Sequence, residues 1–193
     1  MRNALIILIC LLGLYGCKPA YPKVIIETSL GDIKIELYAN KATITVRNFL
    51  KYVQNGRYNN AEFYRVVTPE NQPGRKIKIE VIQGGLEYLA NIDTIPGILH
   101  ETTEMTGIHH LDGTISLARD KPGSASTEFF ICVGDQPELD YGGKRNPDGQ
   151  GVAAFGRVIG GMEIVRKIQQ MPADSNQVLL QKIKFKIKGP VGS

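Results

Sequence analysis

Cysteine is scarce in this 193-residue chain, and its scarcity excludes a disulfide-stabilised fold. There are three cysteines, and Cys10 and Cys17 lie in the predicted targeting segment at residues 1–20, so Cys132 has no partner for an internal disulfide. Its apolar neighbours, Ile131 and Val133, predict a buried strand position with no chemistry of its own. A strong charge excess is also lacking: the net charge is only +4, which gives nucleic-acid binding no support. No internal repeat and no low-complexity segment is present.

The chain also lacks an apolar run long enough to span a bilayer comfortably, which requires roughly 20 residues. Residues 4–14 are apolar and follow Arg2, as in the core of a signal peptide. The run ends in Leu14-Tyr15-Gly16-Cys17, which is similar to the lipobox of bacterial lipoproteins. We therefore predict a lipoprotein signal peptide at residues 1–16, a lipidated Cys17, and a tether over residues 17–22. An ordinary cleaved signal with a stray cysteine is the alternative.

This interpretation predicts a lipid-anchored protein of the bacterial cell envelope, facing the periplasm if the cell is Gram-negative. Residues 23–188 are predicted to form one domain, followed by a tail at 189–193, because about 170 residues is the usual size of a single domain. Lysines at 182, 184, 186 and 188 alternate with Ile183, Phe185 and Ile187, which is typical of an amphipathic strand with one solvated face.

The periodicity predicts a β-rich fold. We expect strands at residues 23–28, 33–38, 63–67, 77–85, 114–118, 128–133, 152–158 and 179–187. Helical spacing of apolar residues predicts helices at 43–54 and 162–170, and Asn55-Gly56 ends the first of them. Seven or eight strands with two short helices, and without a βαβ rhythm, favour an antiparallel barrel or sandwich.

The strand pair between residues 63 and 85 is the most informative stretch. Arg65 interrupts the apolar run Phe63-Tyr64-Arg65-Val66-Val67 with a permanently charged, planar donor group. Alternation predicts one face with Phe63, Arg65 and Val67, and a second with Ile77, Ile79, Val81 and Gln83. A lone strand arginine is usually a solvated edge residue. Aimed donors on a mostly apolar surface are, however, what a small-substrate groove requires.

Further motifs follow this pair along the chain. They are Gln83-Gly84-Gly85, Ser116-Leu117-Ala118-Arg119, Ser126-Thr127-Glu128-Phe129-Phe130-Ile131 and Ala154-Phe155-Gly156-Arg157-Val158. Taken together and in order, the motifs resemble those of the cyclophilin-type peptidyl-prolyl cis-trans isomerases, and the resemblance extends over residues 23–187. It implies a closed eight-stranded antiparallel β-barrel capped by two α-helices. Because a barrel of that size is filled by its own side chains, the resemblance places the substrate groove outside.

The resemblance also implies residue roles. Arg65 matches the family's catalytic arginine and Gln83 matches its glutamine partner. Phe130 corresponds to the floor of the proline pocket and Leu139 to one of its walls. Substrate contacts are further expected from Val81, and from Ala118 and Arg119 on the segment that pairs with the substrate backbone.

Several positions depart from the family pattern. Glu128, expected in the catalytic set, replaces a glutamine, and Val152 replaces a pocket histidine or tyrosine. Glu138 stands where many members have a tryptophan, and since the chain has no tryptophan, the resemblance implies weak cyclosporin binding. Counting back from Gln83 places Glu80 in the pocket, but the inserted loop at 68–76 leaves open whether Ile79 lies there instead.

The resemblance implies a monomer that isomerises proline-containing segments of exported proteins without a cofactor or metal. A barrel that binds such segments without isomerising them is the main alternative, and the unusual Glu128, Glu80 and Val152 favour it. A lipocalin-like carrier would instead require an internal cavity. The residues of a possible metal site are His100, Glu101, His109, His110 and Asp112. Adjacent histidines in a loop rarely face one ion, so this interpretation is weak.

Overall fold

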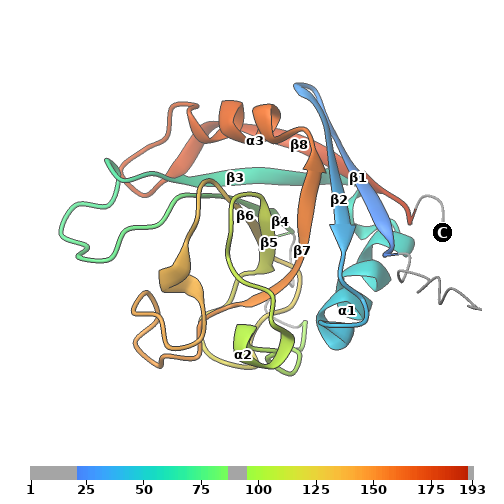
Figure 1. The fold of residues 1–193 in the computed structure, drawn as a ribbon. Coiled ribbons are helices and arrows are strands. Elements are labelled where there is room, and N and C mark those ends of the chain that lie inside the picture. The colour runs from blue at the N-terminus through green and yellow to red at the C-terminus, as the bar shows by residue number, and fades with distance from the viewer. Residues whose placement is uncertain (1–20, 87–94, 191–193) are drawn as a thin grey trace, which may run out of the picture.

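The structure, a computed structural model, describes residues 21–86 and 95–190. The predicted signal peptide, Cys17 and most of the predicted tether lie outside these ranges. Eight strands form a closed barrel in the order β1-β2-β7-β5-β6-β4-β3-β8 (Figure 1). All pairings are antiparallel, so the predicted barrel is confirmed. The strands are β1 (Lys23–Thr28), β2 (Gly31–Leu37), β3 (Ala61–Val67), β4 (Val81–Gly85), β5 (Thr114–Leu117), β6 (Phe129–Cys132), β7 (Ala153–Gly160) and β8 (Val178–Lys188).

Two helices cover the barrel, one near each end (Figure 1). α1 (Thr43–Gln54) has the predicted bounds, and α3 (Met162–Gln169) ends one residue before its predicted end. The first turn of α1 is held by Glu101, whose carboxylate accepts hydrogen bonds from the Ile44 amide at 3.2 Å and the Thr45 amide at 2.7 Å. A carboxylate at a helix N-terminus satisfies backbone donors that have no partner within the helix.

Among the described residues, three short helical turns lie in the connections. They are η1 (Arg57–Asn60), α2 (Thr103–Thr106) and η3 (Pro137–Leu139). The side chain of Thr102 caps α2 by accepting a hydrogen bond from the Met105 amide. Within the described ranges, no helix combines the length and apolarity that crossing a bilayer requires.

The barrel interior is filled by side chains. Phe63, Phe129 and Phe185 are fully or almost fully buried, and their ring centroids lie 4.6 to 6.0 Å apart. Aromatic packing of this kind leaves the described barrel without the cavity that a lipocalin-like carrier would require. A binding site must therefore be sought on the outside.

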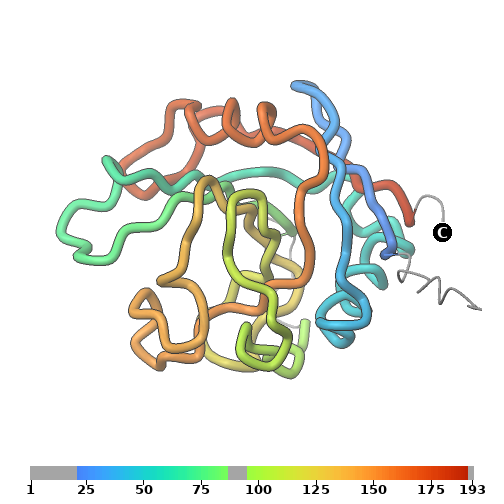
Figure 2. Tube along the Cα trace, in the orientation of Figure 1, coloured from blue at the N-terminus to red at the C-terminus, as the bar shows by residue number. Residues whose placement is uncertain are grey.

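One predicted strand is shorter than expected. β4 begins at Val81, although alternation extends back to residue 77. Instead, the Gln72 side chain donates to the Ile79 carbonyl and accepts from the Ile79 amide. The Glu80 amide donates to Gln136 Oε1 at 3.1 Å. The Glu80 carbonyl still accepts from the Val133 amide at 2.9 Å, but side chains replace the other strand-like bonds. Residues 68–80 form a long loop that extends away from the barrel (Figure 2).

Candidate active site

A β-bulge in β3 directs two consecutive side chains to the outside of the barrel. Phe63 pairs with Gly84 and Arg65 pairs with Gln83, so the register shifts between them. Phe63 packs in the core, whereas Tyr64 and Arg65 line an external groove of 670 Å³. The prediction that Phe63 and Arg65 share one face is therefore wrong, because the bulge adds one residue to the alternation.

Arg65, Gln83 and Phe130 form a row across three neighbouring strands. Arg65 on β3 is the register partner of Gln83 on β4, which is the partner of Phe130 on β6. Neighbouring strands are about 4.8 Å apart, so the backbones of Arg65 and Phe130 are roughly 10 Å apart. A long guanidinium side chain can span most of this distance, with Gln83 between the two residues.

A chain of hydrogen bonds connects Arg65 to Glu128. Arg65 Nη1 donates to Gln83 Oε1 at 2.8 Å, and Gln83 Nε2 donates to the Tyr64 hydroxyl at 2.7 Å. That hydroxyl donates to Glu128 Oε2 at 2.8 Å, while Glu128 Oε1 accepts from the Leu86 amide at 2.6 Å. The sequence predicts Glu128 in the site but assigns no role to Tyr64. Tyr64 was missed because strict alternation does not direct it to the same side as Arg65.

An apolar cluster covers the outside of the barrel beside this row. Phe130 is surrounded by a buried set of side chains: Val67, Ile79, Val81, Cys132, Leu139 and Val152, with Ala118 packed against them. The structure resolves the alternative between residues 79 and 80. Ile79 belongs to the cluster, whereas the Glu80 carboxylate accepts a hydrogen bond from Gln169 Nε2 on α3 at 3.1 Å. Burial raises the pKa of the Cys132 thiol, which therefore stays protonated.

Arg119 lines the groove, but its guanidinium is occupied by the chain itself. Its side chain is 1% exposed and makes two 2.8 Å bonds to the Asp148 carboxylate. The bonds from Arg119 hold the pKa of Asp148 down at about 2. Arg119 Nε also donates to the Gly151 carbonyl at 2.8 Å, directly before Val152. Arg119 thus holds the turn that carries Val152 into the apolar cluster, and it faces the groove beside Ala118.

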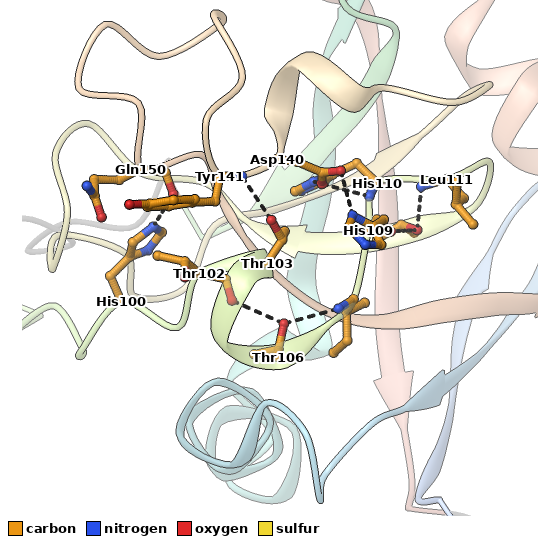
Figure 3. Close-up of polar contacts among 12 residues, drawn as sticks. His100, Thr102, Thr103, Thr106, His109, His110, Leu111, Asp140, Tyr141 and Gln150 are labelled. Carbon is orange, nitrogen blue, oxygen red and sulfur yellow. Dashed lines mark hydrogen bonds and ion pairs between the residues drawn. The ribbon is translucent and has the colours of Figure 1, made fainter.

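The candidate metal residues are engaged in other contacts. His109 and His110 bond separate oxygens of Asp140 through Nδ1, at 2.9 and 2.6 Å (Figure 3). The buried His110 ring lies nearly parallel to Phe130, with ring centroids 6.1 Å apart and an interplanar angle of 16°. Asp140, which directly follows Leu139 in the chain, is thereby bonded to the histidine that stacks on Phe130. Within residues 21–86 and 95–190, no group of three or more His, Cys, Asp or Glu side chains is arranged to hold a metal.

Comparisons with known proteins agree with this geometry. The family model described as "Cyclophilin type peptidyl-prolyl cis-trans isomerase/CLD" matches residues 23–188. Peptidyl-prolyl cis-trans isomerase A of Dickeya dadantii is 33% identical over 180 residues, covering 90% of this chain and 87% of its own length. A peptidyl-prolyl cis-trans isomerase of Acinetobacter baylyi is 37% identical over 151 residues, covering 77% and 72%.

A solved structure supports the fold. A cyclophilin type peptidyl-prolyl cis-trans isomerase of Cryptosporidium parvum has a TM-score of 0.68 to this chain at 22% identity, covering 88% of this chain and 98% of its own. The family match and the two bacterial relatives extend across the strands that carry the groove. The chain therefore belongs to the cyclophilin-type peptidyl-prolyl cis-trans isomerase family.

Proposed function

We propose that this protein catalyses cis-trans rotation about X-Pro peptide bonds, acting on proline-containing segments of exported proteins. The observation that carries the proposal is the row Arg65, Gln83 and Phe130 on one outer face of the barrel. In this row the Arg65 guanidinium lies beside the apolar cluster around Phe130, which is suited to a proline ring. Both parts are needed, because the substrate offers a hydrophobic ring next to a polar imide.

The reaction requires no bond cleavage. Resonance in the X-Pro bond imposes a barrier of about 18–20 kcal/mol, and the uncatalysed exchange takes roughly 10–100 s. In the twisted state the prolyl nitrogen regains a lone pair and accepts a hydrogen bond. Arg65 can donate to that nitrogen without ever losing its own proton. An enzyme of this kind must favour the twisted state over both planar ones.

The magnitudes show why Arg65 alone is not sufficient. A charge-assisted hydrogen bond contributes about 1.5–3 kcal/mol, which corresponds to about one to two powers of ten in rate. The remainder is assigned to orientation in a water-poor site. The proline ring would lie against Phe130, Leu139 and Val152, with Val81 and Ile79 completing the wall. The substrate backbone would run along Ala118 and Arg119.

Substitution of Arg65 tests the proposal. We expect Arg65→Ala to lower kcat/KM in a protease-coupled assay with an Ala-Pro peptide by at least about tenfold, since one charge-assisted bond is lost. Arg57→Ala, which removes an exposed arginine from η1, is the matched control and should retain full activity. An Arg65→Ala enzyme as active as the control would rule out the mechanism.

A binding module that holds proline segments without isomerising them is the second candidate. The replacements Glu128 and Val152 motivate it, whereas Glu80 bonds Gln169 and lies outside the apolar cluster. Its signature would be peptide binding with unchanged cis-trans exchange.

We further propose that the protein acts as a monomer at a membrane surface of the cell envelope, anchored through lipid on Cys17. Nucleic acid, metal and cofactor have no place in this proposal.

A further inference from the structure

The Arg65 guanidinium is held on two sides. On one side, Nη1 donates to Gln83 Oε1 at 2.8 Å. On the other, Gln177 Oε1 accepts from Arg65 Nη2 at 2.5 Å and from Nε at 3.2 Å. Both acceptors are neutral amides, so they fix the plane of the guanidinium without cancelling its charge. Gln177 lies in the turn before β8, far from Arg65 in sequence.

Gln177 is itself anchored by the loop inserted after β3. Its Nε2 donates to the Asn71 carbonyl at 2.9 Å and to Asn71 Oδ1 at 3.3 Å. Asn71 is in turn fixed to β3, because its Nδ2 donates to the Val66 carbonyl at 3.0 Å. The backbone of Gln177 also pairs with β3, through a 3.0 Å bond from the Val66 amide. In Figure 2 the inserted loop and the turn before β8 lie on the same side of the barrel.

The backbone of Gln177 is unusual. Its φ is +70°, and within the described ranges it is the one residue other than glycine with a positive φ. This conformation is unfavourable for a residue with a Cβ, and glycine or asparagine usually occupies it. Gln177 therefore combines an unfavourable backbone conformation with hydrogen bonds to the arginine of the site, and this combination indicates a functional role.

We propose that Gln177 is a positioning residue for Arg65, and that Asn71 in the loop at residues 68–80 sets the orientation of Gln177. The inference rests on the proposed isomerase function. Held at Nε and Nη2 by Gln177 and at Nη1 by Gln83, the guanidinium keeps a single orientation toward the substrate groove. An orientation fixed before substrate binds is one that the reaction does not have to impose.

Gln177→Gly tests the inference without adding backbone strain, because glycine adopts a positive φ freely. We expect kcat to fall by about tenfold or more, since a small misplacement of a reacting group has effects of that order, while KM changes by less than about twofold. Relief of the positive φ should offset much of the loss of the side-chain hydrogen bonds, so we expect only a small change in the melting temperature. Asn176→Gly, at an exposed neighbour in the same turn, is the control and should leave kcat unchanged.

Two further measurements separate positioning from a structural role. The ¹⁵N spectrum should show a protected Arg65 Nε–H in the wild-type protein, and this protection should be lost in Gln177→Gly. In an Arg65→Lys background, Gln177→Gly should change kcat by less than about twofold, because a lysine offers no fork to hold. If the two substitutions each lowered kcat by the same factor whether alone or combined, the inference would be overturned. A Gln177→Gly enzyme with the kcat of wild type would also overturn it. An inactive wild-type protein would instead overturn the proposed function, and this inference with it.

Discussion

Arg65 is charged at every physiological pH, so its orientation, and not its protonation, determines what it can do in the groove. That orientation depends on the bulge in β3, which brings Tyr64 and Arg65 to the same outer face. Tyr64 links Gln83 to Glu128 through its hydroxyl, at 2.7 and 2.8 Å. A phenol both donates and accepts at one atom, so it can connect an amide to a carboxylate.

Glu128 is where the structure adds most to the sequence prediction. Its two oxygens accept from the Tyr64 hydroxyl and the Leu86 amide. An amide in its place offers one oxygen to these two donors. Glu128→Gln should therefore lower the free energy of unfolding by about 1–2 kcal/mol, the cost of an unpaired donor. Isomerase activity should be retained or raised, because Gln83 and Gln177 still hold Arg65.

Denaturant unfolding and the protease-coupled assay on the same samples check both halves of this prediction. Glu104→Gln, at an exposed position of α2, is the matched control for loss of one carboxylate charge. If Glu128→Gln lost more than about tenfold in kcat/KM at unchanged stability, the carboxylate would have to act in the reaction itself.

Asp140 makes the stability of the pocket wall depend on pH. Burial alone would raise its pKa, but the hydrogen bonds from His110 and His109 outweigh burial and leave the pKa below its usual value. A lowered folded-state pKa contributes stability above the unfolded value of about 3.9, and this contribution is lost as pH falls through the lower folded value.

We expect Asp140→Asn to be about 1–2 kcal/mol less stable than wild type at pH 7, the cost of losing charge-assisted hydrogen bonds. The difference should narrow at pH 3. Urea unfolding at the two pH values measures it, with the exposed Asp32→Asn as control. If the difference in unfolding free energy between wild type and Asp140→Asn stayed the same or grew at pH 3, the Asp140 carboxylate would not be the source of the stability.

Among the elements, the loop at residues 68–80 contributes directly to the site, because its Ile79 belongs to the apolar cluster. Gln72 is 2% exposed, and its Nε2 donates to the Thr68 and Ile79 carbonyls at 2.8 Å each. Its Oε1 accepts from Arg145 Nη1 at 2.8 Å. This one side chain therefore holds the loop closed and keeps Ile79 in the apolar cluster.

Gln72→Ala should lower stability by about 1–3 kcal/mol, because buried backbone groups lose their partners. It should also raise KM for Ala-Pro peptides several-fold as Ile79 leaves the pocket wall. Thermal unfolding and a KM measurement check this, and Lys76→Ala in the same loop is the exposed control. An unchanged KM in a destabilised variant would show that Ile79 does not contact the substrate.

The elements with strong local patterns were predictable, and those set by distant contacts were not. Helical spacing predicts the bounds of α1, and lysine alternation predicts the solvated face of β8. The bulge at Tyr64 has no signature in the alternation, so the sequence places Phe63 on the wrong face. Glu101 capping α1 and Gln177 gripping Arg65 are contacts across 56 and 112 residues, which no local pattern encodes. The motif resemblance predicted Gln83, Phe130 and Leu139 beside Arg65 because it carries tertiary information.

For the whole molecule, a filled barrel requires the chemistry to lie outside. The interior aromatic residues hold the strands in place, and the groove is built on β3, β4 and β6, with contributions from the turns before β7 and β8. Rigid strands suit this purpose, because side chains on them are positioned more accurately than side chains on loops. Every described residue that lines the groove follows β1, which begins at Lys23.

The predicted anchor is a property of the whole chain and can be tested separately from catalysis. Cys17→Ser removes the only sulfur to which lipid would be attached in the proposed mature protein. In a detergent phase-partition experiment we expect the wild-type protein in the detergent phase and the variant in the aqueous phase, without incorporated radiolabelled palmitate. The kcat/KM of the isolated variant should stay within about twofold of wild type, because the groove lies elsewhere. Palmitate incorporation equal to wild type would refute the anchor.

Nuclear magnetic resonance exchange spectroscopy on an Ala-Pro peptide measures whether this groove catalyses rotation about X-Pro bonds. We expect a catalytic amount of the wild-type protein to produce exchange cross-peaks between the cis and trans signals, and Arg65→Ala to remove them. Saturable peptide binding by the wild-type protein, with cis-trans exchange no faster than in free peptide, would refute isomerase activity and identify a binding module.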